Sequence, residues 1–158
     1  MDATIEATIL DILSKQTDMT LATVREDGYP QATTVSFVSD GLDIYFACSP
    51  RSQKARNIAR SNKISVTVTP PYTDWNSIRG LSIGGRAERV VENAQVRYTE
   101  ALFFRKFPFV VQYTPEDRSD LAVFRIRVEI ISVLDYTKSF GHTDVVEIPA
   151  TPARGASA

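Results

Sequence analysis

The sequence predicts a mainly β fold of the α+β type: an antiparallel barrel of six strands with flanking helices. Several short segments alternate apolar and polar residues, which is the pattern of half-buried strands. Most of these segments are joined by short turns with glycine or proline, which favours antiparallel neighbours over the crossover helices of a parallel sheet. The chain has 158 residues and 43% hydrophobic content, which suits one domain with a single core.

The chain is predicted to open with an amphipathic helix over residues 3–15, where isoleucines and Leu13 recur at helical spacing. A meander of three strands follows. Its two turns are signalled by Asp27-Gly28 and Asp40-Gly41, because these residues tolerate the backbone angles of tight turns. The three predicted strands are residues 19–25, 31–38 and 42–47.

A basic helix is predicted over residues 51–61, directly after the third strand. Ser49-Pro50 ends that strand, and Ser49 or Ser52 can cap the helix. The first turn of a helix carries unpaired N–H groups and a partial positive charge, so Lys54 and the serines form an anion site. A phosphate-bearing ligand is therefore expected here; the alternative is an ordinary solvated basic helix.

The second half of the chain contains the remaining three strands and a third helix. Pro70-Pro71 ends the fourth strand, since proline cannot donate to a strand ladder. Gly84-Gly85, within the fifth strand, predicts a bulge or a close backbone approach. The elements are strands 63–69, 79–91 and 121–136, a helix over 92–107, and one short helical turn opened by 114–117.

The last residues, 149–158, are rich in alanine, proline, glycine and serine, and we expect a flexible tail. Residues 1–148 then form one domain. No apolar stretch has membrane-spanning length, and the acidic N-terminus and single cysteine favour the cytoplasm.

Composition excludes several function classes. The 18 basic and 19 acidic side chains give a net charge of −1, which argues against a nucleic-acid partner. One cysteine, Cys48, and one histidine, His142, cannot build a Cys/His zinc site, so no metal site is predicted. His142 is a candidate proton donor, although a structural or solvated histidine is the commoner case. Redox chemistry would require a bound organic cofactor.

Five segments, in this order and spacing, resemble the pyridoxamine-5′-phosphate-oxidase-like family of FMN-binding split barrels. They are Leu21-Ala22-Thr23-Val24, Asp27-Gly28-Tyr29-Pro30, Tyr45-Phe46-Ala47-Cys48, Ser52-Gln53-Lys54-Ala55-Arg56-Asn57 and Gly85-Arg86-Ala87-Glu88. The resemblance covers the chain from about Thr17 to Tyr136. It implies a split barrel that forms a homodimer with FMN sites at the subunit interface.

The resemblance also implies the cofactor-binding residues. One strand would present backbone and side-chain groups to the flavin, the end of the next strand would continue the site, and Lys54 would bind the phosphate. Arg79 would stand near the flavin pyrimidine. The full set is Thr33, Thr34, Val35, Ser36, Ala47, Cys48, Ser49, Gln53, Lys54 and Arg79.

Departures from the family pattern bear on the substrate. Phe37 stands where the true oxidases have a second basic residue, and their Arg/His-rich C-terminal segment has no counterpart in residues 134–144. The expected function is therefore an FMN-dependent oxidoreductase of unknown small-molecule substrate, with NADH or NADPH as a candidate reductant and no residue assigned as catalytic. The alternatives are a non-catalytic flavin-binding or stress-related module, and a deazaflavin- or haem-binding relative on the same barrel.

Overall fold

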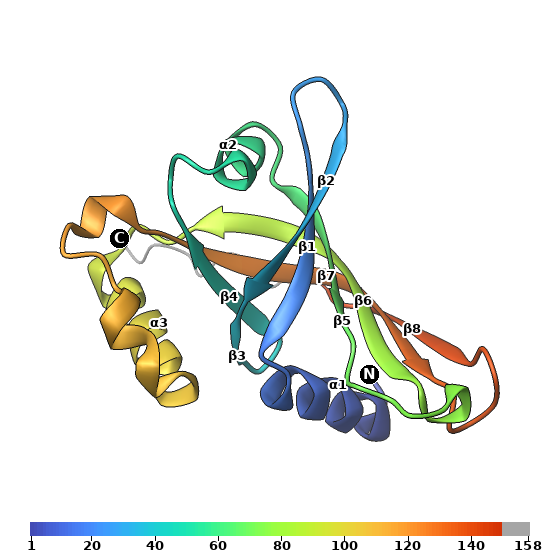
Figure 1. The fold of residues 1–158 in the computed structure, drawn as a ribbon. Coiled ribbons are helices and arrows are strands. Elements are labelled where there is room, and N and C mark those ends of the chain that lie inside the picture. The colour runs from blue at the N-terminus through green and yellow to red at the C-terminus, as the bar shows by residue number, and fades with distance from the viewer. Residues whose placement is uncertain (150–158) are drawn as a thin grey trace, which may run out of the picture.

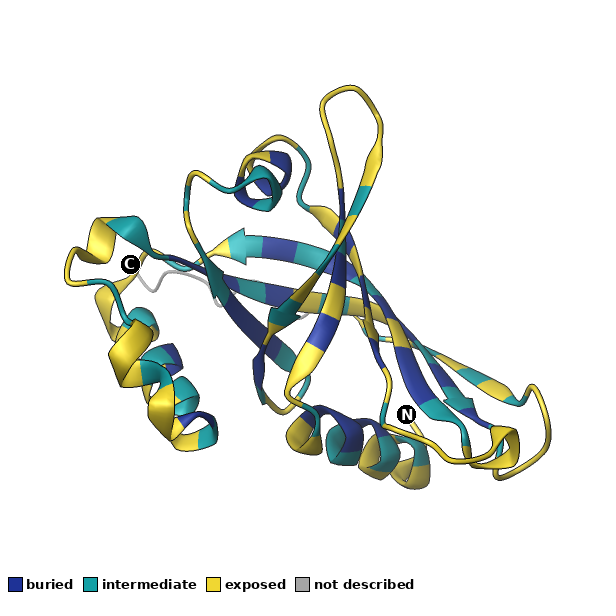
Figure 2. Ribbon diagram, in the orientation of Figure 1, coloured by how far each residue is buried: buried dark blue, intermediate teal, exposed yellow. Residues whose placement is uncertain are grey.

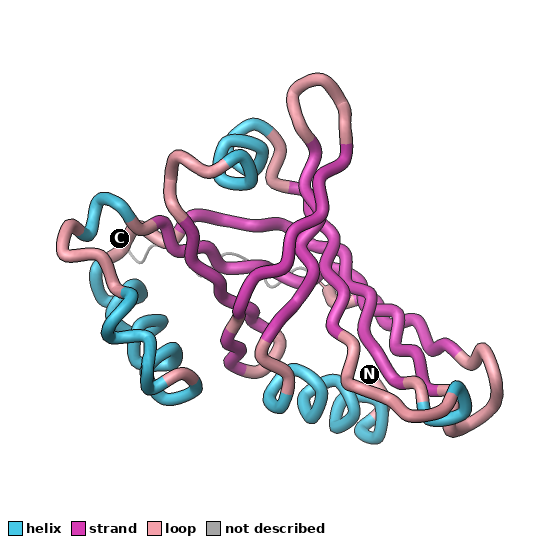
Figure 3. The backbone as a smooth tube through the Cα atoms, in the orientation of Figure 1, coloured by secondary structure: helices cyan, strands magenta, loops and turns pink. Residues whose placement is uncertain are grey.

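The computed structural model describes residues 1–149 and shows one antiparallel sheet curled into a half-barrel, with helices outside it (Figures 1 and 3). The strands are β1 (Asp18–Val24), β2 (Pro30–Ser36), β3 (Val38–Asp40), β4 (Asp43–Cys48), β5 (Lys63–Val68), β6 (Arg79–Arg89), β7 (Ala122–Asp135) and β8 (Thr143–Glu147). The α-helices are α1 (Ala3–Lys15), α2 (Gln53–Arg60) and α3 (Asn93–Lys106). Short 3-10 helices are η1 (Trp75–Ser77), η2 (Pro108–Tyr113) and η3 (Arg118–Asp120).

The order of strands explains how the barrel closes. The path is β2-β1-β5-β6-β7-β4-β3, and β8 pairs with β7 outside this path. β2 and β4 belong to opposite ends of the path, yet they are in contact. The curl of the sheet therefore brings its two ends together.

The structure corrects the predicted number of strands, since the sheet has eight strands and not six. The predicted strand 31–38 ends at Ser36, because Phe37 leaves the ladder and is fully buried, and a separate short strand, β3, begins at Val38. β8 was missed because this short edge strand carries Thr143, Asp144 and Glu147 and has no buried residue. The architecture itself, an antiparallel split barrel with flanking helices, is confirmed.

The predicted helices are confirmed, with boundaries that shift by no more than two residues. The predicted helical turn after 114–117 begins later than expected. Asp117 caps η3 by accepting a hydrogen bond from the Ser119 N–H at 2.8 Å, so Thr114 is not the cap. η2 was not predicted. The predicted tail 149–158 lies, apart from Pro149, outside the described residues.

The core fills the concave side of the sheet and is closed by α1 (Figure 2). Ile9, Ile12 and Leu13 of α1 are at most 1% exposed, as their helical spacing requires for a buried stripe. The rings of Phe46 and Phe124, on neighbouring strands, stack at 5.1 Å between centroids. No helix within residues 1–149 has the length and apolar character needed to cross a bilayer.

The predicted irregularity at Gly84-Gly85 is confirmed as a shift of register between β6 and β7. The two glycines differ in what surrounds them. A Cβ on Gly85 would lie 2.4 Å from the Arg127 carbonyl oxygen, which belongs to the backbone of the neighbouring strand. A Cβ on Gly84 would meet only the Cγ2 methyl of Ile130, at 2.9 Å.

Gly85→Ala is therefore expected to lower the free energy of unfolding by about 1–3 kcal/mol, because the β6–β7 backbones must separate. Gly84→Ala is the matched control and should cost less, since its one close contact is with the side chain of Ile130, which is 40% exposed, and not with backbone. Urea unfolding of both variants measures the difference. Equal stability of the two would contradict the role assigned to the backbone contact at Gly85.

Candidate functional site

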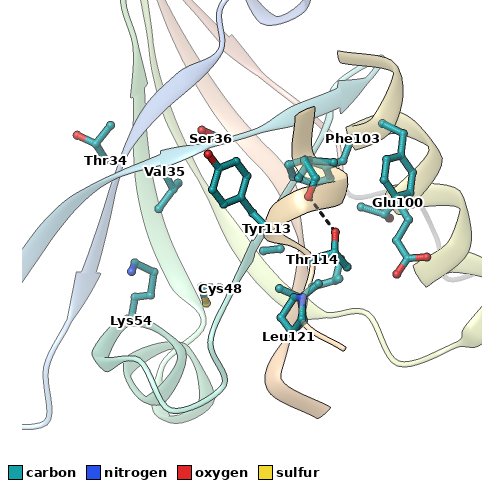
Figure 4. A pocket seen from close by; sticks show the side chains of 16 residues that line it. Thr34, Val35, Ser36, Cys48, Lys54, Glu100, Phe103, Tyr113, Thr114 and Leu121 are labelled. Carbon is teal, nitrogen blue, oxygen red and sulfur yellow. Dashed lines mark hydrogen bonds between the residues drawn. The ribbon is translucent and has the colours of Figure 1, made fainter. Parts of the chain in front are cut away.

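A cavity of about 410 Å³ lies where the two ends of the sheet meet, between β2, the end of β4, the start of α2 and the α3–η2 segment (Figure 4). Thr34, Val35 and Ser36 of β2 line one wall, and the Ser36 hydroxyl there donates to Asp18 Oδ1 at 2.8 Å. Leu121 and Val123, at the start of β7, complete the floor. This volume lies within the range of ligand-binding pockets, about 300–1,000 Å³.

Six of the ten predicted cofactor residues line this cavity: Thr34, Val35, Ser36, Ala47, Cys48 and Lys54. They come from three elements that are separate in sequence. β2 and β4 reach the same place because the sheet closes there, and α2 follows β4 after a short loop. The predicted anion site at Lys54 and the predicted polar strand thus face one common space.

The other predicted residues near this site point elsewhere. Thr33 does not line the cavity, and its buried hydroxyl has no hydrogen-bond partner among residues 1–149. The Ser49 hydroxyl accepts a hydrogen bond from the Arg51 N–H at 3.2 Å and shapes the loop before α2. Gln53 Nε2 donates to Asn57 Oδ1 at 2.8 Å, within α2.

Arg79 is far from the cavity of its own chain. It pairs with Asp135 at one end of β7, whereas Cys48 pairs with Ala122 at the other end. These ends are separated by 13 steps along the strand (135 − 122), or about 40 Å at roughly 3.3 Å per residue. Arg79 could therefore reach a cofactor only in a neighbouring subunit.

Lys54, at the start of α2, is a candidate to bind an anionic ligand. The Ser52 hydroxyl caps the helix by accepting a hydrogen bond from the Ala55 N–H at 3.3 Å, so Lys54 lies in the first turn. Arg51, by contrast, is paired with Asp120 at 2.8 Å. Among residues 1–149 no carboxylate lies within ion-pair distance of Lys54.

A buried polar network holds α2 against the barrel. Asn57 is 2% exposed, and its Nδ2 donates to Thr23 Oγ1 at 2.9 Å and to Gln31 Oε1 at 3.1 Å. Together with the bond from Gln53, all of these contacts converge on one amide. In the sequence, Asn57 was noted only as the last residue of the segment Ser52–Asn57, and its structural role was not predicted. The spacing of four residues between Gln53 and Asn57 was the available signal, because it places both side chains on one face of the helix.

The second wall of the cavity, formed by α3 and η2, was missed. It is aromatic, with Phe103, Phe104 and Tyr113 on the cavity side. The end of this helix also contacts the rest of the barrel through Lys106. Lys106 Nζ lies 4.2 Å from the centroid of the Phe37 ring and donates to the Leu13 carbonyl at 3.4 Å. Burial of this ammonium lowers the pKa of Lys106.

Glu100 is the only carboxylate on the cavity wall, within the described residues. It forms an ion pair with Arg118 of η3, and its Oε1 is buried. In Figure 4 Glu100 and Phe103 lie on the side of the cavity opposite Lys54, with Tyr113 and Leu121 between them. The cavity thus has a cationic end and an end that carries a paired carboxylate.

His142 does not contribute to this cavity. It lies in the turn between β7 and β8, where its Nε2 is 2.9 Å from Asp144 Oδ2. Lys138 Nζ donates to the same oxygen at 2.7 Å. Hydrogen bonds from Lys138 and His142 lower the pKa of the Asp144 carboxyl. Within one chain, His142 therefore serves a hairpin at the far end of β7.

The chain was compared with protein families, curated proteins and solved structures. A model of the family described as pyridoxamine 5′-phosphate oxidase matches residues 5–135. A search of curated proteins finds no match. A heme binding protein from Mycobacterium smegmatis has the same fold, with a TM-score of 0.75 and 22% identity over 93% of this chain; the chain covers only 58% of that protein.

Two other solved structures are more similar in sequence. A conserved hypothetical protein from Mycobacterium tuberculosis is 26% identical, with a TM-score of 0.74, and the match covers 97% of this chain and 94% of that one. A protein described as an F420 reductase is 28% identical, with a TM-score of 0.62, over 77% of this chain and 94% of that one. Proteins with this fold are therefore described by different cofactors, heme in one case and F420 in another.

Proposed function

This chain belongs to the pyridoxamine 5′-phosphate oxidase family, and we propose that it binds FMN in the cavity and works as an FMN-dependent oxidoreductase on a small molecule. The observation that carries the proposal is the meeting of Lys54, at the start of α2, with the hydroxyl-bearing wall of β2 in one cavity. Each of these two features matches one part of the cofactor.

The phosphate fits the start of α2. Lys54 supplies a charge that no carboxylate among residues 1–149 neutralises, and the first turn of the helix adds N–H groups and a partial positive charge. Ser52 fixes this turn through its cap and also donates to Cys48 Sγ at 3.4 Å. The start of α2 is thereby linked to Cys48, which lines the cavity.

The ring fits the space between the two walls. Thr34 and Ser36 lie on one side, where the Ser36 hydroxyl donates to Asp18 Oδ1 at 2.8 Å and can still accept, and Phe103 and Phe104 offer apolar surface on the other. A planar ring with polar edges needs both kinds of contact. Cys48 is half-buried and lines the cavity, where its small side chain leaves room for the ring.

FMN, when bound, supplies hydride or electron transfer. The residues of the chain then bind and orient it and exclude water from one of its faces. Glu100 is held by Arg118, so the cavity of one chain contains no unpaired carboxylate among its described lining residues. No acid or base is assigned, and NADH or NADPH is the reductant to test first.

A haem cofactor is matched less well. The only histidine of the sequence, His142, lies in the β7–β8 turn, so within one chain an iron ligand from the cavity would have to be Cys48 or Tyr113. A deazaflavin has the ring shape of a flavin and is the closer competitor. A protein that binds flavin without turning over is the remaining alternative.

Absorbance and titration separate these cases. We expect the protein to take up FMN with a dissociation constant in the micromolar range or below, about −8 kcal/mol or more favourable. Bleaching of the bound flavin by NADH or NADPH, and reoxidation by an added acceptor, would support an enzyme over a binding module. A Soret band on haem addition with no uptake of FMN would overturn the proposal.

A homodimer is part of the proposal, and the outer face of the sheet supports it. Thr20, Thr67, Ser82 and Ser132 stand in register across β1, β5, β6 and β7. The neighbouring row, formed by Ala22, Ser65, Gly84 and Ile130, is also uncharged. A surface of small, uncharged side chains suits close packing against a second copy of the chain.

Light scattering after size exclusion should therefore give twice the 17.6 kDa of the chain at micromolar concentration. Ser65→Arg, at the centre of this face, should shift the protein toward the monomer because a charge would be buried without a partner. Ser14→Arg, an exposed change on α1 and outside this face of the sheet, is the control. A wild-type protein that elutes as a monomer would contradict the dimer.

A further inference from the structure

A second hollow, of about 470 Å³, lies beside the cavity and is lined by three arginines. They come from different elements: Arg89 ends β6, Arg97 lies on α3, and Arg118 lies on η3. We call this hollow the arginine recess. It shares Glu100, Leu121 and Val123 with the cavity as common walls.

The charges of the recess are not balanced. Glu100 neutralises Arg118, but among residues 1–149 no carboxylate lies within ion-pair distance of Arg97 or Arg89. Like charges gathered around one hollow repel each other, and a bound anion would relieve this repulsion. Guanidinium groups bind carboxylates and phosphates through paired hydrogen bonds, so an anion of this kind is the matching ligand.

The recess lies beyond the end of the cavity that is opposite Lys54. Glu100 belongs to both hollows, and Figure 4 shows it on the side of the cavity opposite Lys54. A cofactor whose phosphate is held at Lys54 would thus leave the recess free. A molecule entering at the other end of the cavity could place a charged group in it.

We propose that the arginine recess binds the anionic group, a carboxylate or a phosphate, of the substrate. This inference rests on the proposed function, because it assigns the substrate to the end of the cavity that FMN phosphate does not occupy. Arg118 has a second role in it: an incoming anion competes with Glu100 for this guanidinium. The substrate class is therefore a small anionic molecule.

Calorimetric titration with inorganic pyrophosphate tests the recess without knowledge of the substrate. The double variant R89Q/R97Q should bind pyrophosphate about tenfold or more weakly than the wild type. The double variant R105Q/K63Q removes the same charge outside the recess and should bind as the wild type does. K54Q, which lacks the other anion site, should retain the binding that depends on the recess.

FMN titration of the same proteins separates the two proposals. R89Q/R97Q should bind FMN as the wild type does, and K54Q should not. Pyrophosphate binding that is lost in K54Q and kept in R89Q/R97Q would overturn the recess as an anion site. FMN binding that fails in R89Q/R97Q and survives in K54Q would place the cofactor phosphate in the recess and overturn both assignments. Pyrophosphate binding in the recess with no FMN uptake by any of the proteins would overturn the proposed function alone.

Discussion

Replacing Lys54 by glutamine is expected to weaken FMN binding by about 10- to 150-fold, since hydrogen bonds to charged groups contribute about 1.5–3 kcal/mol. The folded protein should keep its stability. Lys54 has no ion-pair partner among residues 1–149, so its removal breaks no contact that supports the barrel. The effect should therefore appear in binding and not in the melting temperature.

FMN titration by flavin absorbance or fluorescence measures this effect. Lys63→Gln is the matched control, because Lys63 is exposed at the start of β5 and lies outside the cavity. Lys54→Arg should recover part of the affinity, since it restores the charge with a different geometry. If the glutamine variant bound FMN as tightly as the wild type, Lys54 would not hold the phosphate.

The second large effect is expected from Asn57→Ala, which should lower the free energy of unfolding by about 3 kcal/mol. Asn57 is 2% exposed; it accepts a hydrogen bond from Gln53 and donates to Thr23 and Gln31. Its loss leaves buried polar groups without partners, which costs more than the bonds themselves. The melting temperature should fall by roughly 10 °C in a chain of this size.

This variant should also weaken FMN binding, because the network holds α2, and with it Lys54, against β1 and β2. Asn76→Ala is the matched control, since Asn76 is exposed in η1. The two asparagine variants and Lys54→Gln are distinguishable: only Asn57→Ala should change both stability and affinity. An Asn57→Ala protein that melted with the wild type would show that α2 is anchored in another way.

Local patterns were sufficient for most of the fold. Alternation along 63–69, the turn at Asp27-Gly28 and the serine before α2 each depend on a few neighbouring residues, and each appears in the structure as predicted. The exceptions also have local causes. The alternating pattern continues from residue 31 to residue 38, but in the structure Phe37 separates β2 from β3. β8 is a polar edge strand with no buried residue.

The cavity could be predicted only in part. Lys54 and the β2 residues were found because helix-start chemistry and a polar strand face are visible in sequence. The α3–η2 wall could not be found in this way, because it reaches the cavity through tertiary packing. The Asn57 network joins residues 34 positions apart, and the distance of Arg79 from the cavity depends on the pairing along β7.

A crystal structure of the protein with FMN tests the central claim most directly. The phosphate is expected at the start of α2, within hydrogen-bond distance of Lys54 Nζ, with the ring between Thr34 and Ser36 on one side and Phe103 on the other. Density for the phosphate at any other place, or a cavity that stays empty at saturating FMN, would contradict the assignment of this cavity to the flavin.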